Sequence, residues 1–321
     1  MPPRSLLWSG RLSVLRERFP EHDFILDPQA AAASPAEIDA LLASRVEGSF
    51  IEAASSLKAL FLPLTGVNHL PLDLLSRRGI KVYNVHGNAE SVAQCALAMT
   101  LAFYGRTIEY HNDLKNAVWH GFWVGKGAED EWNSIFRRSC AIFGTGAIGL
   151  ALARMLKAFD CEVIGYRRRA GLPVPPNFDR VETDFRRAVG GAELLFVALP
   201  LSPATEGLFS KEVLLAAAGK FLVNVGRGRV VDEEGLYLAL RDGILKGAAI
   251  DTWYEYPKAG ATSGPPSRFP IHLLPNVVLS PHVGGSTREA NVIAAVQTME
   301  NIAEWLLTGG CSREVDLERM Y

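Results

Sequence analysis

A short glycine-rich segment, residues 144–149 with the sequence GTGAIG, restricts the fold of this chain more than any other feature. It lies between an apolar run, CAIF, that predicts a strand and a run, LALARMLKAF, that predicts an amphipathic helix. Gly144 permits a tight turn, Gly146 lets the backbone approach a pyrophosphate, and Gly149 lets helix and strand pack closely. The N–H groups and the dipole at the start of the helix then favour an anion. We therefore expect a dinucleotide site, with a purely structural turn as the alternative. The predicted cofactor-binding residues are Gly144, Gly146, Ala147, Ile148 and Gly149.

Apolar runs alternate with amphipathic stretches along most of the chain, which predicts an α/β fold. In the glycine region the predicted strands are 140–143, 162–166, 194–198, 221–225, 248–250 and 277–279. Before it, we expect strands at 23–26, 58–62 and 80–83, and helices at 12–19, 35–43 with Ser34 as N-cap, and 71–78. Nearly continuous apolar strands are typical of parallel sheets covered on both faces. At 321 residues the chain is about twice the length of a common domain, so we expect two domains.

The charge balance and the cysteine spacing exclude several classes of function. The chain has 33 basic and 35 acidic residues, so it lacks the positive excess that is typical of nucleic-acid-binding domains. The 4 cysteines lie too far apart for a C-x-x-C zinc or redox site, and the histidines show no metal spacing, so we expect no metal. No apolar run approaches the ~18 residues of a membrane span, and the run at residues 6–8 is too short for a signal peptide. We expect a cytoplasmic protein without nucleic-acid or membrane partners.

Three arginines, Arg167, Arg168 and Arg169, follow the second predicted strand of the glycine region. Folds of this kind place the residue that reads the adenosine ribose at this position. An acidic residue would accept hydrogen bonds from the ribose hydroxyls, whereas arginine can bind a 2′-phosphate with two N–H groups. We therefore expect Arg167 and Arg168 to bind the cofactor and NADP to be preferred, with NAD as the alternative. The alternative is that these arginines form a solvated basic loop without a function.

Polar residues follow three later predicted strands. Arg227 lies in NVGRG, Asp251 in AIDTWYEYP and His282 in SPHVGGST. Because the carboxyl ends of parallel strands line the ligand crevice of an open sheet, these side chains can converge beside a bound nicotinamide. Taken alone, the arginine is as well explained by a surface ion pair, and the histidine by an ordinary loop position.

The order of these segments resembles the D-isomer-specific 2-hydroxyacid dehydrogenase family. The likeness runs from about residue 57 to 307 and includes LKALFLPLTGVNHL, RRGIKVYNVHGNAESVA, LPLSPATEGLF, NVGRGRVVDEEGLYLAL and LSPHVGGST. It implies two Rossmann-like domains with parallel sheets. An NAD(P)-binding domain, residues 94–285, is expected to be inserted into a discontinuous substrate domain, residues 1–93 and 286–321. The helices predicted at 90–104 and 288–307 match the family's crossover helices, and family members are commonly dimers, so we expect a homodimer.

The resemblance also implies roles for single residues. Arg227 corresponds to the arginine that binds the substrate carboxylate and polarises the carbonyl group, and His282 corresponds to the general acid or base. Asp251 matches the aspartate that hydrogen-bonds the nicotinamide carboxamide. The backbone N–H groups of Thr65 and Gly66 match the loop that holds the substrate carboxylate. The remaining cofactor contacts that the family implies are Pro200, Ser202, Val225, Gly226 and Gly284.

One position departs from the family pattern. The family's D-V-F-x-x-E-P segment places a glutamate beside the catalytic histidine, whereas this chain has Tyr256 there and Glu255 one residue away. A carboxylate would raise the pKa of the histidine, and a phenol can orient the ring without adding charge. Three interpretations stay open. Tyr256 acts as a neutral partner and is catalytic together with Arg227 and His282, Glu255 turns inward, or turnover is weak and the protein is mainly a binder.

These observations give a set of functional expectations. We expect an NAD(P)-dependent enzyme that transfers hydride between the cofactor and a small 2-oxo or D-2-hydroxy acid, with glyoxylate or hydroxypyruvate suggested by the resemblance. A dehydrogenase for a bulkier or non-carboxylate substrate and a cofactor-sensing interaction protein are the alternatives. The irregular stretch 117–132 holds Trp119, Trp123 and Trp132 and is a candidate subunit interface, with packing over the chain's own domain as the alternative.

Overall fold

The computed structural model describes residues 4–258 and 260–320, so residues 1–3, 259 and 321 of the predicted domains lie outside it. The chain divides into two compact units, residues 1–88 with 286–321 and residues 89–285. The first division falls after Asn88, where helix α5 (Ala89–Tyr104) begins, and not after residue 93. None of the described helices combines the length and the apolar character needed to span a bilayer.

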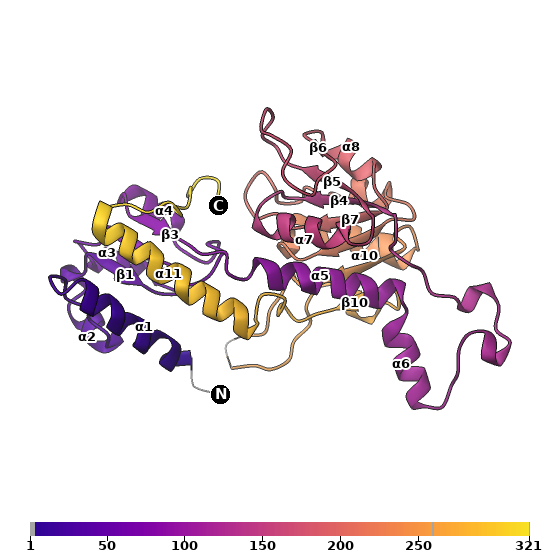
Figure 1. Ribbon diagram of the computed structural model, residues 1–321, viewed down its shortest axis with the longest axis horizontal. Coiled ribbons are helices and arrows are strands. Elements are labelled where there is room, and N and C mark those ends of the chain that lie inside the picture. Colours follow the sequence, from indigo (N-terminus) through magenta and orange to yellow (C-terminus); the bar gives the residue numbers. More distant parts are fainter. Residues whose placement is uncertain (1–3, 259, 321) are drawn as a thin grey trace. The chain divides into compact units, whose positions relative to one another are not determined.

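The first unit contains a three-stranded parallel sheet in the order β1-β2-β3 (Figure 1). Its strands are β1 (Ala40–Leu42), β2 (Ala59–Phe61) and β3 (Lys81–Tyr83). Its helices are α1 (Arg4–Arg18), α2 (Pro28–Ala33), α3 (Gly48–Ala53), α4 (Leu72–Arg77) and α11 (Arg288–Thr308). Alternate residues of β2 face opposite sides: Leu60 packs in a core with α3 and α4, and Phe61 packs in another core with α1 and α11. Helices therefore cover both faces of this sheet.

Two predictions for the N-terminal part are wrong. Residues 23–26 form no strand, and Ile25 and Leu26 are 45% and 47% exposed. Residues 35–43 form no continuous helix, because a 3-10 turn (Pro35–Glu37) is followed by β1, and Ser34 makes no side-chain cap bond. Leu41 and Leu42 pair with β2. Pairing with the sheet thus decides the conformation of a segment whose local pattern favours a helix.

The second unit is built on a seven-stranded, fully parallel sheet in the order β10-β9-β8-β7-β4-β5-β6. The strands are β4 (Ser139–Phe143), β5 (Glu162–Tyr166), β6 (Arg180–Glu182), β7 (Leu194–Val197), β8 (Phe221–Asn224), β9 (Gly247–Ile250) and β10 (Val277–Leu279). The helices are α5, α6 (Thr107–Lys115), α7 (Ala147–Lys157), α8 (Phe185–Gly190), α9 (Lys211–Leu215) and α10 (Glu233–Arg241). Ile142 packs with α5 and α7 on one face, and Phe143 packs with α8, α9 and α10 on the other. This confirms the predicted α/β class with parallel sheets; the short polar strand β6 is the one element of this sheet that the sequence pattern misses.

The strand order reverses beside β4 and positions the candidate site. From β4 the chain continues outward through β5 and β6, then returns to β7 on the other side and continues through β8, β9 and β10. Ligands of such open sheets bind outside the carboxyl ends of the strands at this reversal. Because all the strands are parallel, the segments that follow β4, β5, β8, β9 and β10 lie at one edge of the sheet.

Helix α6 and the following segment project from the sheet of this unit (Figure 1). We call residues 107–132 the arm; it contains two 3-10 turns, Phe122–Val124 and Ala128–Asp130. Its large aromatic side chains are exposed, with Phe122 at 76% and Trp123 at 77%. Several large exposed apolar side chains on one short segment are consistent with an interaction site.

Candidate functional site

The turn between β4 and α7 has the geometry of an anion cradle. Gly144 has a φ of +110°, and a Cβ at Gly149 would overlap the carbonyl oxygen of Gly144. Gly146 is the N-cap of α7, and as a glycine it has no side chain that could cap the first turn of the helix. No heavy atom lies within 4 Å of the position that a Cβ at Gly146 would take. The N–H groups of Ala147 and Ile148 at this helix start therefore face an open cradle that fits a diphosphate.

The first two arginines after β5, Arg167 and Arg168, differ in their contacts with the rest of the chain. The Nη2 group of Arg167 donates to the carbonyl oxygens of Leu172 and Pro173, the latter at 2.9 Å. Its buried Nε atom has no hydrogen-bond partner among the described residues. Arg168 is exposed and forms no ion pair with a described residue. Arg168 is therefore available to an external phosphate, while Arg167 braces the loop.

Pro200 and Ser202 lie in a closed turn after β7. Thr205 Oγ1 donates to the Pro200 carbonyl at 2.6 Å and accepts from the Ser202 N–H at 2.8 Å. Ser202 is only 5% exposed, and its hydroxyl lies 3.1 Å from the same Thr205 oxygen. The Ser202 side chain is thus engaged inside the turn, and Thr205, which sequence reasoning does not single out, fixes the shape of the turn.

A second turn, after β8, presents Arg227. Asn224 ties the two ends of this turn together, because its Oδ1 accepts from the Gly226 N–H at 3.2 Å and its Nδ2 donates to the Arg227 carbonyl at 3.1 Å. Val225 is buried, and a Cβ at Gly226 would lie 2.6 Å from the Leu199 carbonyl oxygen. Arg227 is partly buried and donates to the Gly226 carbonyl at 2.7 Å. No carboxylate of the described residues lies within ion-pair distance of its guanidinium, whose pKa is lowered by burial.

The buried carboxylate of Asp251 holds the segment that carries His282. Asp251 is 2% exposed and accepts hydrogen bonds from the Ser280 hydroxyl at 2.5 Å and from the N–H groups of Val283 at 2.9 Å and Gly284 at 3.1 Å. Both carboxylate oxygens are therefore engaged by the loop after β10. The structure thus gives Asp251 a positioning role that sequence reasoning, which assigns it to the nicotinamide carboxamide, does not predict.

Tyr256 lies directly against His282. Its hydroxyl oxygen is 2.8 Å from His282 Nδ1 and accepts from the backbone N–H of Trp253 at 3.1 Å. The indole Nε1–H of Trp253 donates to the Ser280 carbonyl at 2.8 Å, so Trp253 links both segments. Glu255 is exposed, and no hydrogen bond within the described residues joins its carboxylate to His282. The geometry therefore favours Tyr256 over Glu255 as the neighbour of the histidine.

Partial burial shifts the pKa values of this pair, although both side chains are exposed, Tyr256 to 50%. It lowers the pKa of His282, Asp251 opposes that change, and the Arg227 cation adds to it. Burial raises the pKa of Tyr256, while the Trp253 N–H bond and Arg227 act in the opposite direction. At neutral pH the imidazole is therefore mostly neutral and the phenol is protonated.

Thr65 and Gly66 belong to the other compact unit. Within it, Thr65 Oγ1 lies 2.8 Å from the Val85 carbonyl and 2.9 Å from Asn88 Oδ1, and the Thr65 carbonyl accepts from Asn84 at 2.7 Å. The side chain of Thr65 is thus used to hold the loop. The backbone N–H groups of Thr65 and Gly66 have no hydrogen-bond partner among the described residues.

Residues 97–284 match the family model described as the NAD-binding domain of D-isomer-specific 2-hydroxyacid dehydrogenases. The chain belongs to the D-isomer-specific 2-hydroxyacid dehydrogenase family. It is 28% identical over 313 residues, 94% of each chain, to a glyoxylate/hydroxypyruvate reductase B of Pectobacterium carotovorum. It is also 30% identical over 276 residues to the D-3-phosphoglycerate dehydrogenase of Mycobacterium leprae, covering 84% of this chain and 49% of that one.

A solved structure supports the same assignment. An NADPH-dependent glyoxylate/hydroxypyruvate reductase of Sinorhizobium meliloti, in complex with NADP and malonate, is similar at a TM-score of 0.74 and 25% identity, covering 97% of this chain and 95% of that one. The predicted family and the predicted class of reaction are confirmed: this member of the 2-hydroxyacid dehydrogenase family is an NAD(P)-dependent oxidoreductase.

Besides Thr205, Asn224 and Trp253 of this dehydrogenase site are missed by sequence reasoning. Asn224 could have been found, because an asparagine at the start of a turn commonly accepts a hydrogen bond from the backbone N–H two residues on, here that of Gly226. Trp253 could not, because its two hydrogen bonds depend on how the segments at Tyr256 and Ser280 fold back towards it.

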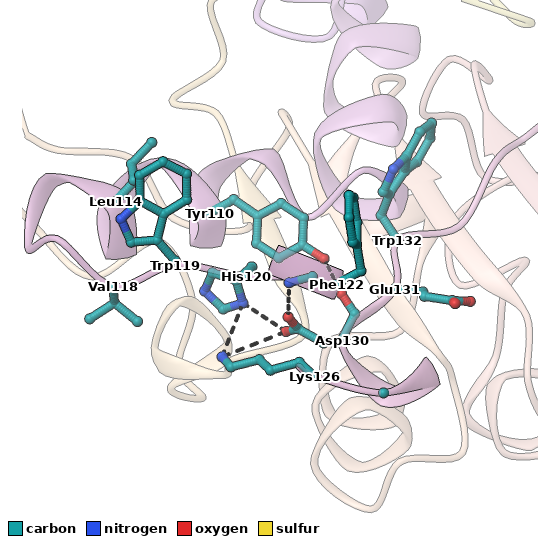
Figure 2. A pocket seen from close by; sticks show the side chains of 12 residues that line it. Tyr110, Leu114, Val118, Trp119, His120, Phe122, Lys126, Asp130, Glu131 and Trp132 are labelled. Atoms are coloured by element: carbon teal, nitrogen blue, oxygen red, sulfur yellow. Dashed lines mark hydrogen bonds and ion pairs between the residues drawn. The ribbon is translucent and has the colours of Figure 1, made fainter. Parts of the chain in front are cut away.

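A separate pocket of about 560 Å³ lies in the arm (Figure 2). The ring of Tyr110 lies against His120, with the ring centroids 4.6 Å apart, and Trp119, Phe122 and Trp132 also line the pocket. None of the strand-end residues described above lines it. The pocket is therefore not a second candidate for the site of the dehydrogenase reaction.

An ion-pair cluster within the arm joins its loop to helix α6. His120 Nδ1 lies 2.7 Å from Asp130 Oδ1, and Nε2 lies 2.9 Å from Asp113 Oδ2. The N–H of Gly121 donates to the other Asp130 oxygen at 2.6 Å. The two carboxylates, Asp130 first, raise the pKa of His120. This internal cluster holds the loop against α6, while the rings of Trp119, Phe122 and Trp132 stay exposed.

Two alanine substitutions separate the structural from the binding role of the glycine turn. Gly149→Ala places a Cβ against backbone and should lower the free energy of unfolding by about 1–3 kcal/mol. Gly146→Ala meets open space, so it should keep the stability and weaken binding of the dinucleotide. Urea unfolding and a fluorescence titration with NADPH measure the two effects; equal losses of stability would contradict this division.

Proposed function

We propose that the protein is an NADP-preferring reductase of a small 2-oxo acid, with glyoxylate or hydroxypyruvate as candidate substrates. The observation that carries this proposal is Arg227, a partly buried cation without a carboxylate partner among the described residues, at the same strand edge as His282. Such a cation is suited to an anionic substrate. The names of the Pectobacterium and Sinorhizobium relatives support this choice of substrates.

The residues of the site divide the chemistry between them. When bound, a reduced nicotinamide supplies the hydride. Arg227 binds the substrate carboxylate and polarises the carbonyl group, which stabilises the charge that grows on its oxygen. His282 donates a proton to that oxygen. Asp251 and Trp253 hold the loops that carry His282 and Tyr256.

The two compact units take different parts in this proposal. The unit 89–285 binds the cofactor, through the glycine turn, the turn at Pro200 and Ser202, and the strand-end loops with Val225, Gly226 and Gly284. The unit of residues 1–88 and 286–321 contributes the unpaired N–H groups of Thr65 and Gly66 to the substrate carboxylate. We assign the protein to the cytoplasm.

We also propose a homodimer, with the arm as the interface. The exposed rings of Trp119, Phe122, Trp123 and Trp132 support it, because aromatic side chains are enriched in the cores of interfaces. The internal ion-pair cluster of His120 would give such an interface a fixed shape.

Replacing Arg227 tests the proposed activity. Arg227→Ala should lower kcat/KM for the 2-oxo acid by at least about 10²–10³-fold, because a preorganised donor to the developing oxyanion is lost. Arg229→Ala, whose side chain is 65% exposed, is the matched control. The assay follows NADPH and NADH oxidation against a panel of 2-oxo acids. No turnover by the wild type, together with tight NADPH binding, would favour a binding protein instead.

Replacing Arg168 tests the cofactor preference. Arg168→Asp should raise KM for NADPH and shift the ratio of kcat/KM values towards NADH, because the new carboxylate repels the 2′-phosphate. Arg167→Asp should have a similar effect with an added loss of loop stability. Arg187→Asp carries the same change of charge at a 78% exposed position and should leave the ratio unchanged. A wild-type preference for NADH would contradict the proposal.

Polar substitutions in the arm test the dimer. Phe122→Ser with Trp123→Ser should convert a dimer into a monomer, because the exposed rings lose their apolar contact. Sedimentation equilibrium measures the mass. Leu273→Ser, at an equally exposed position outside the arm, is the control and should leave the mass unchanged. A wild-type monomer would show that the arm is not a dimer interface.

A further inference from the structure

We propose that Tyr256 is the proton source behind His282, and that the neutral imidazole relays the phenol proton to the oxygen of the reduced substrate. This inference rests on the proposed function, since it concerns the proton that accompanies reduction of a 2-oxo acid. It goes beyond an orienting role, because the tyrosine gives up a proton during the reaction.

The hydrogen bonds at the Tyr256 hydroxyl define the direction of that proton. The oxygen accepts from the Trp253 N–H at 3.1 Å and lies 2.8 Å from His282 Nδ1. An amide N–H can only donate, so the phenol proton takes no part in the first bond. Within the described part of the chain, His282 Nδ1 is the only other atom hydrogen-bonded to this hydroxyl, and it accepts the phenol proton when the ring proton lies on Nε2. In the resting state of the relay the phenol donates to Nδ1, and the ring proton of the neutral imidazole lies on Nε2.

A glutamate at position 256 would stabilise the opposite protonation state of His282. An ionised carboxylate only accepts, so it would bond the Nδ1 proton and stabilise the imidazolium. A phenol that donates to Nδ1 stabilises the neutral ring instead. The tyrosine thus changes which group holds the transferable proton, not only the strength of one hydrogen bond.

The charges around the pair are consistent with a relay. Arg227 after β8 and Asp251 after β9 act on both rings, and the Cys95 thiol on α5 lies near Asp251. Glu255, the adjacent acidic residue, is exposed. Arg227 is the cation that would stabilise a transient phenolate at Tyr256.

The step balances without a further reactant. The carbonyl carbon accepts the hydride of the reduced nicotinamide, and the π electron pair moves to oxygen. The Nε2–H bond of His282 breaks as the product O–H bond forms, and the phenol O–H bond of Tyr256 breaks as the Nδ1–H bond forms. After the product leaves, a solvent proton binds Nε2 and the Nδ1 proton returns to the phenolate.

The ring tautomer tests the geometry in the free protein. Nitrogen NMR should show His282 as the Nε2–H tautomer at neutral pH, and Tyr256→Phe should shift its population towards Nδ1–H. Tyr237→Phe, at a tyrosine of α10 that stacks on Phe269, is the matched control and should leave the His282 signals unchanged. A wild-type ring that carries its proton on Nδ1 would overturn the proposal.

The pH dependence of single-turnover reduction tests the relay itself. The wild-type rate should stay level as pH rises through the pKa of His282, because the phenol still supplies the proton. In Tyr256→Phe only the imidazolium can supply it, so the rate should fall about tenfold per pH unit above that pKa, with little change in KM.

Tyr256→Glu supplies the conservative rescue. Its carboxylate raises the pKa of His282, so the rate should be high at low pH and fall as pH rises through the raised value. A wild-type rate that itself falls about tenfold per unit above pH 6.5, the ordinary pKa of histidine, would overturn the relay.

The two proposals fail in different ways. If the wild type reduces no 2-oxo acid, the proposed function is wrong, and the tautomer still decides whether Tyr256 donates to His282. If reduction proceeds and Tyr256→Phe keeps the wild-type rate and pH profile, the proposed function stands and the relay is wrong.

Discussion

The buried carboxylate of Asp251 is the interaction on which the rest of the site depends. Asp251 is 2% exposed, and burying a charged carboxylate costs free energy unless hydrogen bonds replace its hydration. Here the Ser280 hydroxyl and the N–H groups of Val283 and Gly284 do so. All three donors belong to the segment after β10, so the charge ties that segment to the end of β9. It thereby fixes the backbone of His282, whose φ of +58° lies in the sparsely populated left-handed region.

Close backbone packing positions Arg227, as the Asp251 carboxylate positions His282. Cβ atoms at Gly226 and Gly228 would meet the carbonyl oxygens of Leu199 and Trp253, so this turn is pressed between the segments after β7 and β9. Asn224 closes the turn from within. The arginine is therefore positioned by backbone and amide contacts and not by an acidic neighbour. That arrangement leaves its charge available to a ligand, which an ion pair would not.

The sequence predicts this fold well where the local pattern and the sheet agree. Buried parallel strands are apolar throughout, so β4, β5 and β7–β10 are evident, whereas the polar edge strand β6 is not. The pattern fails around β1, because strand pairing outweighs a helical periodicity. Within the candidate site, the residue types at the strand ends predict Arg227, Asp251 and His282. The contacts among them do not follow from residue types, because they depend on loop conformations that long-range hydrogen bonds decide.

The position of Arg227 gives a physical reason why a tyrosine can serve at position 256. The two side chains are close enough for the charge of each to influence the titration of the other. A carboxylate at position 256 would set a negative charge in the field of the arginine and weaken its attraction for an anionic substrate. A phenol adds no charge in the resting state, so the cation keeps its full effect on the substrate carboxylate. The neutral ring of His282 follows from the same balance, since Arg227 and burial both disfavour the imidazolium. A site with one strong cation and a neutral histidine then needs its proton from a group that is protonated at neutral pH, and the phenol of Tyr256 is such a group.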